Sequence, residues 1–133
     1  MKNQNETLKI LTKEWVLKAQ EDERSAEILI KEGGSPNTIC FLAQQIAEKY
    51  LKAFLVFNNQ EFPKIHDLER LLKFCEKIER SFNKLQEEAR FLSSFYIATR
   101  YPGEFPNFDL KTAKEAFEKA KKIKSFVLKR IKL

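Results

Sequence analysis

Polar residues that could bind a ligand recur at intervals of four along one stretch of the sequence. Gln44, Glu48 and Lys52 stand in a run without Gly or Pro, so on a helix they would stack on one face. His66, the single histidine, directly precedes Asp67. Amide, carboxylate, ammonium and imidazole groups together could hold a polar ligand such as a phosphate. An ordinary Glu48–Lys52 ion pair and a structural histidine would give the same pattern.

Two more charged residues stand out by their positions. Asp22 falls between Ala19 and Ala26 on the apolar stripe of a predicted helix, where a carboxylate needs a partner or water. Arg100 falls at the end of another predicted helix, where a cation also suits the helix dipole. If the helices alternate in direction, the ends that carry His66 and Arg100 need not meet, so the sequence alone does not unite them in one site.

The sequence lacks the motifs of the common enzyme classes. It has no Gly-rich phosphate loop, no Cys-x-x-Cys and no His-Glu-x-x-His. A single histidine rules out a site with several histidine ligands, and no nucleophile elbow supports a serine triad. We therefore assign no catalytic residue, and we expect no metal and no cofactor.

The polar residues require long helices to position them. The central predicted helix, from Thr38 to about Phe57, has an apolar stripe at helical spacing, formed by Ile39, Leu42, Ile46, Tyr50, Ala53 and Phe57. Its opposite side is mixed, because Phe41 and Leu55 accompany the polar residues. We therefore expect the helix to be covered on both sides, by other helices or by a partner subunit.

Further amphipathic segments predict the rest of the fold. They run from near Thr12 to Lys31 after a lead-in or extra turn, from Asp67 to about Arg80, from Lys84 to about Arg100, and onward from Asp109. Gly33-Gly34 should end the first, and Ser35, Asp67 and Asp109 should cap the following ones, with Pro36 at the first helical position.

Composition and connection lengths favour one fold class. The chain has 133 residues with only three Gly and four Pro, which is typical of a single helical domain. We predict an all-α fold over residues 1–133, an up-and-down antiparallel bundle of four long helices plus a shorter one. Cys40 and Cys75 should be buried free thiols. Met1–Lys13 lacks an apolar signal region and no run is long enough for a membrane span, so we expect a cytoplasmic protein.

The positive charge gathers at the C-terminal end. The chain has a net charge of +6, and its segment from Lys111 to Leu133 contains nine Lys or Arg and only two Glu. Such a helix could face RNA or an acidic protein. It could equally be a solvated face whose cations suit a helix C-terminus, and we favour this second interpretation.

Several of these stretches resemble one known family. Phe41–Ala53, FLAQQIAEKYLKA, is similar to the F-x-A-Q-Q-A-A-E-K-x-L-K-A helix of the HEPN domain (higher eukaryotes and prokaryotes nucleotide-binding). Three shorter segments, in the family's order, resemble its A-x-x-D, T-H-D-L and x-R-Y-P motifs: Ala19–Asp22, Ile65–Leu68 and Thr99–Pro102. The resemblance covers nearly the whole chain.

The resemblance implies a helical bundle that dimerises. Bacterial and archaeal relatives are often encoded beside a small nucleotidyltransferase and form toxin–antitoxin-type pairs with it. Some are metal-independent RNases, whose signature is an Arg followed after four to six residues by a His. After Arg100 these positions hold Phe105, Pro106 and Asn107. No imidazole is therefore available there for proton transfer, which argues against RNase activity.

We therefore expect a nucleotide-associated HEPN-type binding protein without catalytic residues, a homodimer and the partner of a small nucleotidyltransferase. The residues expected to bind a nucleotide or RNA are Asp22, Gln44, Glu48, Lys52, His66 and Arg100, with Lys49 as a further candidate cation. Two alternatives stay open: a metal-independent RNase toxin with an unusual residue set, and a purely structural interaction module whose polar residues only fix helix packing.

Overall fold

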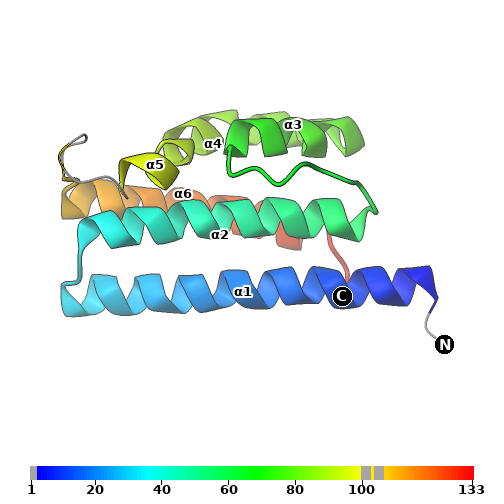
Figure 1. Ribbon diagram of the computed structural model, residues 1–133, viewed down its shortest axis with the longest axis horizontal. Coiled ribbons are helices and arrows are strands. Elements are labelled where there is room, and N and C mark those ends of the chain that lie inside the picture. Colours follow the sequence, from blue (N-terminus) through cyan, green and yellow to red (C-terminus); the bar gives the residue numbers. More distant parts are fainter. Residues whose placement is uncertain (1–2, 100–102, 104–106) are drawn as a thin grey trace.

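The chain folds as a bundle of antiparallel helices (Figure 1). The computed structural model describes all residues except 1–2, 100–102 and 104–106. Within the described residues there are no strands, and the elements are α1 (Gln4–Glu32), α2 (Pro36–Phe57), α3 (Leu68–Ile78), the 3₁₀ helix η1 (Arg80–Leu85), α4 (Gln86–Ser93), α5 (Phe95–Ala98) and α6 (Leu110–Leu128). The predicted all-α, antiparallel fold is confirmed. None of the described helices is long and apolar enough to cross a lipid bilayer.

Helix α2 is the centre of the bundle. It packs against α1 on one side, against α6 on another, and against α3, α4 and α5 on the remaining side. Of its apolar stripe, Ile39, Ile46, Tyr50 and Ala53 are fully buried and Leu42 and Phe57 are half-buried against the core, and Leu55 on the opposite side is fully buried as well. The expectation that this helix is covered on both sides is therefore confirmed.

The helix ends follow the capping residues in the sequence. At the start of α2, the Ser35 side chain accepts a hydrogen bond from the N–H of Thr38, and Pro36 follows Ser35 as the first residue of the helix. Asp67 and Asp109 cap α3 and α6 in the same way, with N···O distances of 3.0 and 2.8 Å to the nearest backbone N–H. Gly33 adopts the left-handed conformation (φ 75°) that ends α1. The predicted caps and stop are confirmed.

The first helix is longer than predicted. Its α-helical pattern begins at Gln4 rather than near Thr12, because the Asn3 side chain accepts a hydrogen bond of 2.8 Å from the N–H of Glu6. Residues 4–11 therefore form two further turns of α1, so of the two predicted alternatives the additional helix is correct and the frayed lead-in is not.

The predicted single helix from Lys84 to about Arg100 is wrong within its described part. A 3₁₀ helix precedes α4, and the α-helical hydrogen-bond pattern is interrupted at Ser94, before the short α5. Ser93 accepts a hydrogen bond from the N–H of Leu68 at 3.3 Å and donates one to Asp67 at 3.4 Å. These contacts fix the last residue of α4 against the start of α3. Arg100, the predicted end, lies outside the described residues.

Both cysteines are free and buried, as predicted. Burial raises the pKa of the Cys40 thiol to about 11, and Asp109 adds to the shift. Burial also raises the pKa of Cys75, by more. Both thiols are therefore held in their unreactive protonated form at neutral pH.

Candidate functional site

A buried carboxylate, that of Glu48, lies at the centre of a polar network. Its Oε1 accepts a hydrogen bond from Gln44 Nε2 at 3.1 Å and lies 3.0 Å from His66 Nδ1. Its Oε2 lies 3.0 Å from Lys52 Nζ. The side chains of Glu48 and Lys52 are only 5% and 8% exposed. The sequence placed these residues on a polar helix face, but the structure shows that the face is buried.

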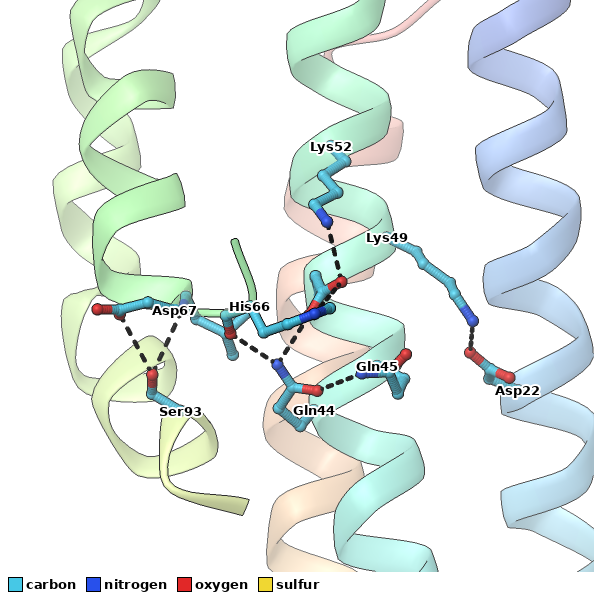
Figure 2. A network of polar contacts seen from close by, with 10 residues as sticks. Asp22, Gln44, Gln45, Lys49, Lys52, His66, Asp67 and Ser93 are labelled. Atoms are coloured by element: carbon cyan, nitrogen blue, oxygen red, sulfur yellow. Dashed lines mark hydrogen bonds and ion pairs between the residues drawn. The ribbon is translucent and has the colours of Figure 1, made fainter. Parts of the chain in front are cut away.

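The loop between α2 and α3 closes over this face. Gln44 Nε2 donates to the backbone oxygen of His66 at 3.0 Å, and Gln45 Nε2 donates to Gln44 Oε1 at 2.7 Å. Figure 2 shows His66 reaching from the loop towards α2, beside Gln44. Gln44 and Glu48, four residues apart on α2, therefore hold the backbone and the side chain of His66, respectively.

The His66 ring is fixed in orientation and yet accessible. Its side chain is 46% exposed, and the ring stacks on Tyr96 with centroids 4.0 Å apart and planes 12° apart. The Glu48 carboxylate oxygens lie 3.0 and 3.2 Å from Nδ1. The His66 tautomer with its proton on Nδ1 donates it to this carboxylate and leaves Nε2 as a hydrogen-bond acceptor.

A cavity of about 240 Å³ adjoins the ring, lined by His66, Asp67, Ser93, Tyr96 and Ile97. Figure 2 shows Asp67 and Ser93 close together at the start of α3. The cavity thus combines an aromatic pair and an aliphatic side chain with a carboxylate and a hydroxyl. This composition suits a small ligand that has a flat apolar part and polar edges.

Lys52 occupies an aromatic environment that the sequence did not reveal. Its Nζ lies 5.5 Å from the ring centre of Trp15 on α1 and 6.0 Å from that of Phe62 in the loop. Aromatic faces stabilise a desolvated ammonium. Together with Glu48 they satisfy the buried cation, so Lys52 acts on the site through Glu48.

Asp22 is not brought into this network. It pairs with Lys49 between α1 and α2, and Figure 2 shows this pair on the side of α2 that faces α1, away from His66 and Asp67. The two side chains are 19% and 20% exposed. The structure therefore unites Gln44, Glu48, Lys52 and His66, and it separates Asp22 from them.

The remaining predicted residue, Arg100, lies outside the described residues. Sequence reasoning assigned no role to Tyr96 or Ser93, because both were treated as parts of one continuous helix. The serine pair Ser93-Ser94 was the signal for a helix break. In the described part of the chain, no group of three or more His, Cys, Asp or Glu side chains is arranged to hold a metal ion.

The geometry describes a helical-bundle domain with a buried polar network under an accessible imidazole. The sequence model of the HEPN domain family matches residues 12–131, and the chain belongs to the HEPN domain family. No curated protein is similar enough to count as a match.

Two solved structures are similar to the chain over most of its length. The protein TT1696 from Thermus thermophilus is 28% identical, with a TM-score of 0.76 over 90% of this chain and 98% of that one. The protein ST0689, described as an archaeal HEPN homologue, is 27% identical, with a TM-score of 0.74 over 91% and 98%. Both likenesses agree with the family assignment.

Proposed function

We propose that this HEPN protein binds a nucleotide at the cavity beside His66, without catalysing a reaction, and that it acts as a homodimer with a small nucleotidyltransferase as partner. The observation that carries the proposal is the Glu48 network, which fixes a half-exposed imidazole at the edge of a cavity. The partner and the homodimer rest on family resemblance, and the ligand rests on this geometry.

The central helix carries charged side chains in the interior of the bundle. A bundle core gains stability from apolar side chains, whereas a buried ion pair is often no better than an apolar pair of the same size. Gln44, Glu48 and Lys52 are nevertheless buried on the central helix. Their common effect is to hold His66, so a role in positioning that ring explains their presence.

The proposal gives different roles to the site residues. His66, with Tyr96 and Asp67, would contact the base or sugar of the nucleotide, while Gln44, Glu48 and Lys52 hold His66. Arg100 would supply a cation for phosphate, for which the guanidinium group is suited. Asp22 is left in its ion pair with Lys49.

Calorimetric titration with ATP, other nucleotides and RNA tests the ligand part of the proposal. We expect saturable binding that His66→Ala and Arg100→Ala each weaken about tenfold or more, a loss of about 1.4 kcal/mol. Asp22→Asn is the control, since Asp22 belongs to the other ion pair, and it should bind as the wild type does. Absence of saturable binding by the wild type would refute the ligand part and favour a structural interaction module.

The partner part has its own test. Co-expression with the nucleotidyltransferase encoded by a neighbouring reading frame should give a complex that survives affinity purification and gel filtration. If the neighbouring frames encode no such enzyme, or if the two proteins elute separately, this part of the proposal fails and the ligand part is unaffected.

One observation favours a second candidate, metal-independent RNA cleavage by His66. A carboxylate that holds Nδ1–H leaves Nε2 as a proton acceptor, which is the arrangement of a general base. In this case expression should arrest growth, and His66→Ala should relieve the arrest and abolish cleavage of a test RNA in the presence of a chelator. Unimpaired growth together with intact RNA would exclude this candidate.

A further inference from the structure

The outer face of α1 carries three large aliphatic side chains on one line. Ile10, Leu17 and Ile28 are 40%, 50% and 55% exposed. Their spacings of seven and eleven residues place them within about 20° of one another around the helix and along about 27 Å of its length. This aliphatic stripe is more ordered than the scattered exposed residues of an ordinary surface.

The aliphatic stripe lies opposite the face with which α1 packs onto the bundle. Ala19 and Ala26, on the inner face, are fully buried against α2. In Figure 1, α1 forms the outer edge of the bundle, with α2 on its inner side. The stripe therefore adds nothing to the core of the chain that carries it.

The charges beside the aliphatic stripe have opposite signs on its two sides. Between Ile10 and Glu32, the exposed charged residues within about 60° of the stripe separate completely by sign. The acidic flank consists of Glu14, Glu21 and Glu32, and the basic flank consists of Lys13, Arg24 and Lys31.

We infer that a second copy of this chain docks on the aliphatic stripe, with the two α1 helices parallel and in register. Each aliphatic residue then meets its counterpart, and on both sides the acidic flank of one copy faces the basic flank of the other. An antiparallel pair would place like charges together. The inference rests on the homodimer of the proposed function and names its interface, which lies apart from the His66 cavity.

Sedimentation equilibrium tests the position of the interface. Leu17→Glu should raise the dissociation constant of the dimer about tenfold or more, because it buries a charge opposite its own copy. Leu11→Glu is the matched control: Leu11 is 42% exposed but lies about 100° from Ile10 around the helix. A Leu17→Glu dimer as tight as the Leu11→Glu dimer would overturn the inference.

Charge reversal tests the orientation. Glu14→Lys with Glu21→Lys makes both flanks basic and should weaken a parallel dimer, and adding Lys13→Glu with Arg24→Glu should restore it. In an antiparallel dimer the acidic flanks face each other, so the first change would not weaken it, and that result would refute the parallel arrangement. A dimer that survives Leu17→Glu overturns this interface alone, whereas a wild type that is monomeric throughout overturns the proposed homodimer as well. Nucleotide titration of each variant reports separately on the His66 site.

Discussion

Removal of the Glu48 carboxylate should destabilise the protein far more than the loss of an ordinary helix ion pair. Lys52 Nζ lies 3.0 Å from Glu48 Oε2, and both side chains are less than a tenth exposed. In Glu48→Ala the ammonium would remain buried beside Trp15 and Phe62 without a counter-charge. Breaking a buried pair in this way costs about 3–5 kcal/mol, whereas an exposed pair at the same spacing contributes about 0.3–0.5 kcal/mol.

Urea unfolding measures this difference. It is monitored by circular dichroism and by the fluorescence of Trp15, the chain's only tryptophan. The matched control is Glu118→Ala. Glu118 pairs with Lys121 at 3.0 Å, one helical turn away, but its side chain is 70% exposed. We expect Glu118→Ala to cost less than about 0.5 kcal/mol and Glu48→Ala to remove a large fraction of a total stability of about 5–15 kcal/mol.

A double variant separates stability from positioning. Glu48→Leu with Lys52→Met replaces both charges by apolar groups and should recover most of the lost stability, while His66 loses its carboxylate partner and nucleotide binding weakens. A loss below about 1 kcal/mol in Glu48→Ala, similar to that of Glu118→Ala, would refute the view that buried Lys52 depends on Glu48 for its counter-charge.

Three further predictions concern other buried polar groups. Tyr50→Phe should stabilise the protein by about 1 kcal/mol, because the hydroxyl is buried without a hydrogen-bond partner among the described residues. Burial also raises the pKa of Tyr50 to about 12, so the stability of the wild type should fall as the pH rises from about 10 to 12. That part of the fall should be absent in Tyr50→Phe. Burial alone would raise the pKa of Glu88, but the hydrogen bond from Lys122 lowers it overall. Lys122→Met should therefore reduce the free energy of unfolding by about 1 kcal/mol or less above pH ~4.5. This reduction should fade as the pH falls through the lowered pKa of Glu88. Cys40 and Cys75 should react with a thiol reagent only after unfolding, and a rapid reaction of the native protein would contradict their burial.

Much of the fold follows from local signals in the sequence. The caps at Ser35, Asp67 and Asp109 each require one side chain and the N–H groups that follow it, so they can be predicted without tertiary structure. The break at Ser94 could not be predicted from the apolar period, because that period continues through it. The break lies beside Ser93, whose side chain contacts the start of α3, a helix that is distant in the sequence.

The candidate site was predicted in part. Four-residue spacing correctly stacked Gln44, Glu48 and Lys52 on one face of a helix, but the spacing alone does not show whether that face is covered. His66 reaches the face through a loop without periodic structure, so its meeting with Glu48 is a result of tertiary folding. The separation of Asp22 depends likewise on the way in which α1 packs onto α2.

The most direct test of the Glu48 network is the hydrogen bond between the single imidazole and the Glu48 carboxylate. Because the chain has only one histidine, long-range ¹H–¹⁵N NMR of the ring reports on His66 without assignment ambiguity. We expect a proton on Nδ1, held by Glu48, and ring resonances that shift on titration with a nucleotide. A ring without a proton on Nδ1, or ring resonances unchanged by every nucleotide, would contradict the claim that the Glu48 network positions His66 for a ligand.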